Sequence, residues 1–239
     1  MQTEQSRQRG IPVTFTVEAI LFDMDGTLID STPGVLKAWE TFSKDYSLGD
    51  SLAIAHATHG RRLYDTLREY CRIEDGAKLL DEVNRFEDEV LKGGPIALPG
   101  AAHLLSKLNS TSSQWAIVTS ASNIYAPRAL EIAGVPLPKV GLVTSNDVSH
   151  GKPHPEPYLA GAIRCGVDAS KCLVVEDAVS GLKSGRAAGA LTLAVCTSTS
   201  RKVILDSDAN PDYLVTDLRK VTTRVVDNMI EITIDETQE

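Results

Sequence analysis

The stretch AILFDMDGTLIDS, residues 19–31, runs an apolar segment directly into two aspartates that are separated by one position. Its first four residues, 19–22, are typical of a strand buried on both faces of a sheet. Alternate residues of an extended chain point to the same side, so Asp23 and Asp25 can face one site. Because two carboxylates this close repel each other, one would be protonated unless a cation compensates them. The alternative is an acidic loop splayed into water, which the buried strand and the tight turn allowed by Gly26 disfavour.

Apolar runs of the same kind recur in the second half of the chain, at residues 115–118, 140–143, 172–175 and 191–195. Helical patterns lie among them, at residues 101–108, 123–133, 156–165 and 178–188. Pro127 must start the second of these helices late or kink it, and Gly189 is placed to end the last one. Strand–helix alternation of this kind predicts an α/β fold with a Rossmann-like, doubly wound parallel sheet. Ligands of such sheets bind beyond the carboxyl ends of the strands.

Residues 33–92 follow a different pattern, in which apolar side chains recur close to every 3.6 residues and no strand signal interrupts them. This pattern predicts an all-helical insertion that closes at a hinge, GGPIALPG, residues 93–100. We therefore expect a flexible N-terminal arm at residues 1–16, an α/β core at residues 17–32 and 97–239, and a helical cap at residues 33–96. Residues 222–226 and 229–234 alternate around Asp227 and Asn228, which is a weak hairpin signal.

Composition limits the class of protein. The chain has 239 residues, of which 42% are hydrophobic and 23% charged, and its net charge is −8. This balance disfavours a nucleic-acid or acidic-membrane partner, and no apolar run is long enough to span a membrane. The N-terminal residues lack a signal-peptide pattern, so we expect a cytoplasmic protein. The oligomeric state is left open, and a missing GxGxxG after the first strand disfavours dinucleotide binding. Four cysteines have the spacing of buried free thiols: Cys71, Cys165, Cys172 and Cys196.

Three later stretches place polar side chains at the predicted ends of other strands. Thr119 and Ser120 follow one strand, Glu176 and Asp177 follow another, and Lys152 stands in the proline-rich loop GKPHPEP. Each has an ordinary explanation on its own, as a helix cap or a solvated lysine. Together they bring carboxylates, hydroxyls and one cation to a single edge of the sheet. Such oxygen ligands suit Mg²⁺, which prefers one or two carboxylates together with a substrate phosphate.

The segments DMDGTL, VTS, the lysine of GKPHPEPY, and VVEDAVSG resemble, in order, the four signature motifs of the haloacid dehalogenase superfamily. The resemblance covers about residues 17–200, and the tail after about residue 218 carries no motif. An aspartate two residues after the first resembles the phosphatases and phosphomutases of the superfamily and not the true dehalogenases. A helical cap between the first two motifs resembles the phosphoglucomutase-like branch. Within that branch, NDV followed by GKPHPEPY is similar to fungal 2-deoxyglucose-6-phosphate and glycerol phosphate phosphatases.

The resemblance implies a mechanism. Asp23 is the expected nucleophile, which attacks phosphorus and forms an aspartyl-phosphate. Asp25 is the expected general acid, which protonates the leaving alcohol oxygen and then acts as base on the hydrolytic water. Mg²⁺ is expected on Asp23, Asp177 and the backbone carbonyl of Asp25, with Glu176 as a ligand or a neighbour of the ligands. The groups expected to hold the phosphate oxygens are Thr119, the backbone amide of Ser120, and Lys152.

The implied activity is Mg²⁺-dependent hydrolysis of small sugar or polyol monophosphates. In HATHGRRLY, residues 56–64, we expect His59, Arg61 and Arg62 to contact a sugar or polyol hydroxyl, the alternative being a solvated helix end. A sugar phosphomutase is the nearest rival, because it would use the same four motifs. A signalling receiver domain and a non-catalytic binding protein are disfavoured by the helical insertion and by the full set of acids. The expected partner is a small phosphorylated metabolite, and neither nucleic acid nor membrane is expected.

Overall fold

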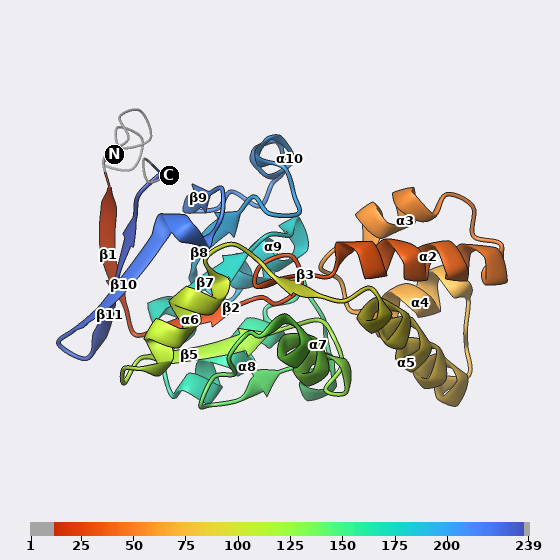
Figure 1. Cartoon of the computed structure of the whole chain (residues 1–239), viewed down its shortest axis with the longest axis horizontal. Coiled ribbons are helices and arrows are strands. Elements are labelled where there is room, and N and C mark those ends of the chain that lie inside the picture. Colours follow the sequence, from red (N-terminus) through yellow and green to blue (C-terminus); the bar gives the residue numbers. More distant parts are fainter. Residues whose placement is uncertain (1–11, 237–239) are drawn as a thin grey trace.

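The computed structural model describes residues 12–236, and a six-stranded parallel sheet lies at its centre (Figure 1). The strand before the aspartate pair, β2 (Ala19–Phe22), is fully buried and lies between β5 and β7. The full order is β6, β5, β2, β7, β8, β9. The bounds of the other strands are β5 Gln114–Val118, β6 Leu142–Val143, β7 Cys172–Glu176, β8 Leu191–Val195 and β9 Tyr213–Val215. Because every pair in this sheet is parallel, the carboxyl ends of its strands meet at one edge.

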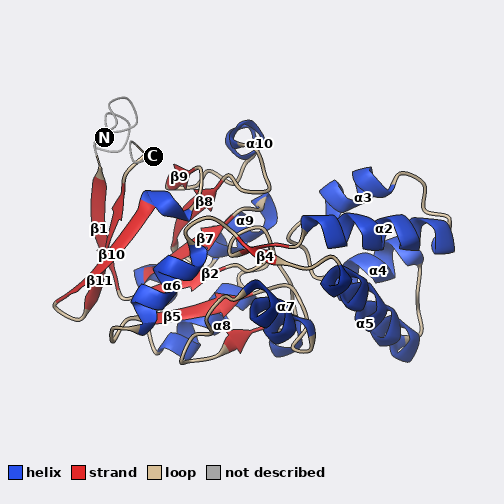
Figure 2. Ribbon diagram, in the orientation of Figure 1, coloured by secondary structure: helices blue, strands red, loops and turns tan. Residues whose placement is uncertain are grey.

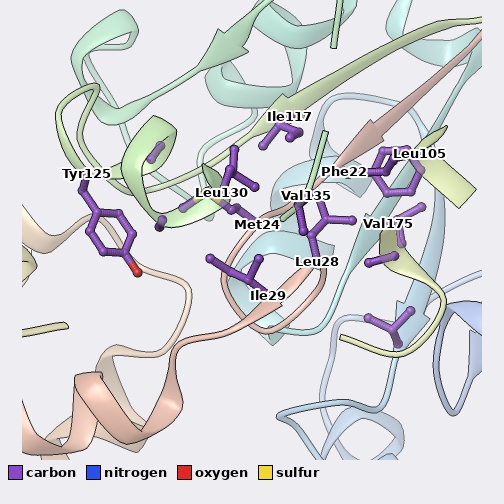
Figure 3. Packing of buried hydrophobic residues seen from close by; sticks show 14 of the residues in the cluster. Phe22, Met24, Leu28, Ile29, Leu105, Ile117, Tyr125, Leu130, Val135 and Val175 are labelled. Carbon is purple, nitrogen blue, oxygen red and sulfur yellow. The ribbon is translucent and has the colours of Figure 1, made fainter. Parts of the chain in front are cut away.

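Helices cover both faces of this sheet. They are α6 Ala101–Asn109, α7 Tyr125–Ala133, α8 Glu156–Cys165 and α9 Val179–Ala187. On the face covered by α6 and α7, Phe22 packs in one cluster with Leu105 and Leu130 (Figure 3). On the face covered by α8 and α9, the neighbouring Leu21 packs with Tyr158. Successive residues of β2 thus point to opposite covered faces, which is why the whole run is apolar. The predicted doubly wound parallel sheet is confirmed.

Four further helices lie between β2 and β5 in the chain and form a helical layer beside the sheet (Figure 2). They are α2 Thr32–Tyr46, α3 Ser51–Thr58, α4 Leu63–Cys71 and α5 Gly76–Lys92. The chain enters and leaves this helical layer through a short antiparallel pair, β3 (Ile29–Asp30) and β4 (Ile96–Ala97). Trp39 and Phe42 of α2 pack edge-on against Phe86 of α5, with ring centroids 5.0 and 5.1 Å apart. The predicted all-helical insertion is confirmed.

The C-terminal hairpin is also confirmed. Strand β10 (Val221–Val226) pairs antiparallel with β11 (Met229–Ile234). Asp227 and Asn228 form the two-residue turn between them, with φ of 51° and 62°. Positive φ at both positions is what a two-residue hairpin turn of this kind requires, and aspartate and asparagine tolerate it well.

The expectation of a flexible arm at residues 1–16 is wrong for its last part. Strand β1 (Val13–Val17) pairs antiparallel with β11, so the hairpin becomes a three-stranded sheet. Phe15 of β1 stacks on Tyr213 of β9, with ring centroids 4.5 Å apart. Both partners are far along the chain, and no pattern within the first residues points to them. Residues 1–11 of the expected arm lie outside the described residues.

Smaller differences concern boundaries and short elements. Helix α7 begins at Tyr125, so Pro127 lies in its first turn. Backbone N–H groups there have no partner within the helix, so the N–H that proline lacks costs no hydrogen bond. The predicted late start is therefore confirmed. Strand β9 and helix α10 (Arg201–Asp206) were not predicted. Short 3₁₀ helices occupy Ser145–Asp147, Ala169–Lys171 and Leu218–Lys220. All four cysteines are free, as expected, and three are buried, but the expected burial is wrong for Cys196, which is only partly buried. No helix within residues 12–236 has the length and apolar character needed to cross a membrane.

Candidate active site

Asp23 and Asp25 leave the carboxyl end of β2, and their side chains have different partners. The backbone N–H of Asp23 donates to the carbonyl of Val175 at 2.9 Å, so the pairing with β7 continues up to this residue. Oδ1 of Asp25 accepts hydrogen bonds from the hydroxyls of Ser31, at 2.6 Å, and Tyr125, at 2.9 Å. Burial raises the pKa of both carboxyl groups. The pair is therefore fixed in place and partly withdrawn from water.

Lys152 joins three strand ends. Its buried Nζ donates to Oδ1 of Asp23 at 2.6 Å, to the carbonyl of Val118 at 3.0 Å and to Oε1 of Glu176 at 2.7 Å. These bonds use all three donors of the ammonium group. Burial alone would lower the pKa of Lys152, but Asp23 and Glu176 outweigh burial and hold that pKa above its ordinary value. The lysine is therefore charged at neutral pH and has a single defined position.

The loop that carries Lys152 is held by side chains on both sides of it. Glu156 accepts hydrogen bonds from the backbone N–H groups of Ser149 and His150, at 2.6 and 3.0 Å. On the other side, the hydroxyl of Ser184 donates to the carbonyl of His154 at 2.6 Å. The proline-rich segment is thus bonded to the first residue of α8 and to the second half of α9, which fixes the direction in which the lysine enters the site.

Glu176 accepts four hydrogen bonds inside the protein. Oε1 accepts from Lys152 and from the hydroxyl of Tyr158, the latter at 2.9 Å. Oε2 accepts from the backbone N–H groups of the next two residues, both at 3.0 Å. A Cβ on Gly181 would lie 1.6 Å from Oε1, so this position of the carboxylate requires glycine on α9. Glu176 is thus engaged in positioning Lys152, and its role as a metal ligand stays a prediction.

Asp177 contacts the turn after β2 and the helical layer at once. Oδ1 accepts a hydrogen bond from the hydroxyl of Thr27 at 3.1 Å. Oδ2 lies 2.7 Å from Nε2 of His59 and accepts a hydrogen bond from Ser198 as well. Burial alone would lower the pKa of His59, but Asp177, together with the charges of Glu176 and Asp23, outweighs burial and raises it to about 9. The imidazole is therefore a cation, and the ion pair connects the helical layer with the end of β7.

Three buried acids share this edge of the sheet. One carboxylate oxygen from each of Asp23, Glu176 and Asp177 lies within 4.8 Å of the other two. Lys152 pairs with Asp23 and Glu176, and His59 pairs with Asp177, so these two cations compensate two of the three charges. Oxygen donors with excess negative charge suit a hard divalent cation. The residues present therefore fit a metal such as Mg²⁺.

Thr119 and Ser120 leave β5 at the same edge. The N–H of Thr119 donates to the carbonyl of Val143 at 2.8 Å, which fixes the buried start of this loop. The hydroxyl of Ser120 donates to the carbonyl of Gly60 in the helical layer at 2.9 Å. Both residues line a cavity of about 130 Å³ between the helical layer and the sheet edge, together with Asp23, Asp25 and Tyr125. A neighbouring hollow of about 760 Å³ also reaches Asp25.

The structure separates the three candidates of the helical layer. His59 and Arg61 both line the smaller cavity, and the guanidinium of Arg61 pairs with Glu69 at 2.5 Å. Arg62 pairs with Asp65 through Nε and Nη2, both at 2.8 Å, and lines an outer hollow beside the loop of Lys152. Contact of these residues with a substrate stays a prediction, which the geometry favours for His59 and Arg61 over Arg62.

Comparison with known proteins matches residues 17–189 to the family described as haloacid dehalogenase-like hydrolase. The chain belongs to this family. Hexitol phosphatase A of Escherichia coli (strain K12) is 41% identical over 180 residues, covering 74% of this chain and 82% of that protein. Glycerol-1-phosphate phosphohydrolase 2 of Saccharomyces cerevisiae is 36% identical over 198 residues, covering 78% of each chain. The crystal structure of beta-phosphoglucomutase from Clostridium difficile has the same fold, with a TM-score of 0.72, 20% identity, and coverage of 86% and 93%. The resemblance drawn from the four motifs is confirmed.

Three residues near the motifs of this haloacid dehalogenase-like hydrolase were missed in the sequence. Tyr158 bonds Glu176, and it is the last letter of GKPHPEPY. Tyr125 bonds Asp25 from the start of α7. Glu87 of α5 accepts hydrogen bonds from the N–H of Ser122, at 2.8 Å, and from its hydroxyl. The sequence signal for Glu87 was an acidic residue next to the apolar positions of a helix. The only signal for the two tyrosines was their place in a motif or at the start of a helix.

Proposed function

We propose that this hydrolase is a Mg²⁺-dependent phosphatase of small sugar or polyol monophosphates. The observation that carries the proposal is the meeting of Asp23, Thr119 and Asp177 at three strand ends with Lys152 from a fourth motif, beside a small cavity that Asp23 and Thr119 line. The relatives named as hexitol phosphatase and glycerol-1-phosphate phosphohydrolase support a hydroxyl-rich leaving group. We further propose that residues 33–96 act as a cap over this site.

The side chains present support a two-step transfer. Lys152 holds Oδ1 of Asp23, which leaves Oδ2 to attack phosphorus and form an aspartyl-phosphate as the bond to the leaving oxygen breaks. Asp25 is held through Oδ1 alone, and its raised pKa favours a proton that can pass to the departing alcohol. The resulting Asp25 carboxylate then takes a proton from the water that attacks the aspartyl-phosphate, which releases inorganic phosphate. Thr119 and the backbone amide of Ser120 hold the phosphate oxygens during both steps, and Lys152, whose three donors bond Asp23, Val118 and Glu176, adds its positive charge beside them.

The acids also support the choice of metal. Asp23, Asp177 and the backbone carbonyl of Asp25 would hold Mg²⁺. Glu176 would position these ligands through its bonds to Lys152 and to the turn after β7. When bound, Mg²⁺ supplies the positive charge that lets an anionic carboxylate approach an anionic phosphate. The net charge of −8 is then compatible with an anionic substrate, because the charge at the site governs its binding.

The charges around the cavity favour a phosphatase over a phosphomutase. A mutase must hold a second phosphate group away from the reacting one, which calls for cations free to bind it. Among the described residues that line the cavity, His59 is paired with Asp177 and Arg61 with Glu69. A leaving group without a second anion matches this distribution of charge better.

The test is a screen for phosphate release from sugar and polyol monophosphates, with and without Mg²⁺ and without any bisphosphate primer. Asp23→Asn is the blank, because it keeps the shape of the side chain and removes the nucleophilic carboxylate. Release from one or more monophosphates by the wild type, and none by the blank, is the expected result. Turnover retained by Asp23→Asn would show that the nucleophile is assigned wrongly, and activity that needs a bisphosphate would point to the mutase.

A further inference from the structure

Glu87 is a buried acid at the junction of the helical layer and the sheet. It lies on α5, is 6% exposed, and faces the start of α7 across the junction. Oε1 accepts the N–H of Ser122 at 2.8 Å, and Oε2 accepts the hydroxyl of the same serine. The described hydrogen bonds and ion pairs of Glu87 contain no lysine, arginine or histidine. Burying a carboxylate this far without a cation costs free energy unless its remaining lone pairs accept hydrogen bonds.

The remaining lone pairs of Glu87 lie beside a cavity. A carboxylate offers about four acceptor positions, and Ser122 occupies two of them on Glu87. Glu87 also lines the cavity of about 130 Å³, next to side chains such as Trp39, Phe86 and Val90 that cannot accept a hydrogen bond. The wall of the cavity contributed by α5 is therefore apolar apart from one strong acceptor.

The place of Glu87 relative to Asp25 fixes which part of a substrate would reach it. Tyr125 bonds Oδ1 of Asp25 at 2.9 Å, and its backbone N–H donates to the hydroxyl oxygen of Ser122 at 3.1 Å. Asp25, Tyr125 and Glu87 thus line one continuous wall of the cavity. If Asp25 protonates the leaving oxygen, as proposed above, the rest of the leaving group extends along Tyr125 toward Glu87.

We infer that Glu87 determines specificity by accepting a hydrogen bond from a hydroxyl of an uncharged polyol or sugar leaving group, and by repelling a leaving group that carries a second anion. This inference rests on the proposed phosphatase function and names the group that its cavity selects. Burial raises the pKa of Glu87 to about 7, so the carboxylate is available as an acceptor at and above neutral pH. An anionic leaving group would face Glu87 and Asp25 together in a small, mostly apolar space.

The test compares kcat/KM for glycerol 1-phosphate, whose leaving group is a neutral polyol, with kcat/KM for phosphoglycolate, whose leaving group carries a carboxylate. Glu87→Gln keeps the size of the side chain and an acceptor for the Ser122 N–H, and it removes the charge. We expect kcat/KM for glycerol 1-phosphate to fall about tenfold, as is typical of losing one hydrogen bond to a charged group. We expect kcat/KM for phosphoglycolate to rise about tenfold, because the variant removes the charge that repels its carboxylate. Opposite changes for two substrates cannot come from poor folding.

Two companion variants keep the result interpretable. Glu89→Gln removes the same charge from the exposed side of the same helix, where Glu89 pairs with Lys92 at 2.6 Å, and should leave the ratio of the two kcat/KM values unchanged. Ser122→Ala keeps the Glu87 carboxylate and removes the hydroxyl it bonds, so it should preserve the preference for glycerol 1-phosphate. The inference is overturned if Glu87→Gln leaves the ratio unchanged, if both substrates lose activity together, or if Ser122→Ala reproduces the change in ratio. The proposed function fails separately, if the wild type releases no phosphate or if Asp23→Asn retains turnover.

Discussion

Replacing Glu87 with glutamine is expected to remove a pH-dependent part of the free energy of unfolding. Burial raises the pKa of this carboxyl group from its ordinary 4.5 to about 7, with the charges of Asp25 and Asp88 adding to the rise and the bonds from Ser122 opposing it. The native protein therefore holds the Glu87 proton more tightly than the unfolded chain does. This contribution to stability is fully present below pH 4.5 and is lost as the pH rises through about 7.

The size of the effect follows from the pKa. Each pKa unit corresponds to about 1.4 kcal/mol, so a rise from 4.5 to about 7 corresponds to roughly 3 kcal/mol. Between about pH 5 and pH 8.5, the stability of the wild type relative to Glu87→Gln is expected to fall by about 2.5 kcal/mol. Most of this fall should occur below pH 7, because above that pH the carboxyl group is ionised in both the native and the unfolded state.

Urea unfolding of the two proteins over this pH range, at fixed ionic strength and Mg²⁺ concentration, measures the effect as a difference between two free energies. Glu89→Gln is the matched control for losing one negative charge from α5 at the surface. The reasoning is refuted if the difference between the wild type and Glu87→Gln stays constant within about 0.5 kcal/mol from pH 5 to pH 8.5. In that case Glu87 would not be a buried titrating group in solution.

Three other outcomes test the site itself. Lys152→Met leaves Asp23 and Glu176 buried without their cation and should cost about 3–5 kcal/mol in urea unfolding, whereas a cost below about 1 kcal/mol would contradict their burial as a unit. Gly181→Ala places a Cβ 1.6 Å from Oε1 of Glu176 and should abolish phosphate release. Its control, Gly76→Ala, has open space around the new Cβ and should change the free energy of unfolding by no more than about 1 kcal/mol. Equal losses of phosphate release in the two variants would refute the steric argument. EDTA should stop phosphate release and added Mg²⁺ restore it, and turnover that persists in EDTA would rule out a required metal.

The central strands were the part of the fold that the sequence predicts best. The bounds of β2 and β8 match the predicted runs, because a parallel strand covered on both faces needs continuous apolar residues. The edge strand β9 has three residues and is only partly buried, so its own sequence carries little signal. Its position depends on pairing with β8 and on Phe15 stacking on Tyr213. Contacts between distant segments of this kind leave no local pattern to recognise.

The candidate site divides in the same way. Asp23, Thr119 and Asp177 could be placed together because each follows a parallel strand, and the topology of such sheets brings those ends to one edge. What each of them bonds could not be predicted. His59 meets Asp177 across 118 positions of sequence, and Glu87 meets Ser122 across 35. These pairs depend on how the helical layer sits on the sheet, which no single stretch of the chain encodes.

The contacts between the helical layer and the sheet edge depend on the size of the substrate's leaving group. The segment around His59 and Gly60 contacts three groups that follow β5 and β7. The Gly60 carbonyl accepts from Ser120, the His59 carbonyl accepts from Ser180, and the His59 ring pairs with Asp177. A Cβ on Gly60 would approach Ser180 Oγ to 2.6 Å, so no bulkier residue allows this fit. Because the same segment lines the cavity, a leaving group too large for the cavity would push it outward and break the contacts to Ser120 and Asp177 together. Under the proposed mechanism, an oversized substrate would then lose kcat as well as affinity, since Ser120 and Asp177 would lose the contacts from the helical layer that hold them in position.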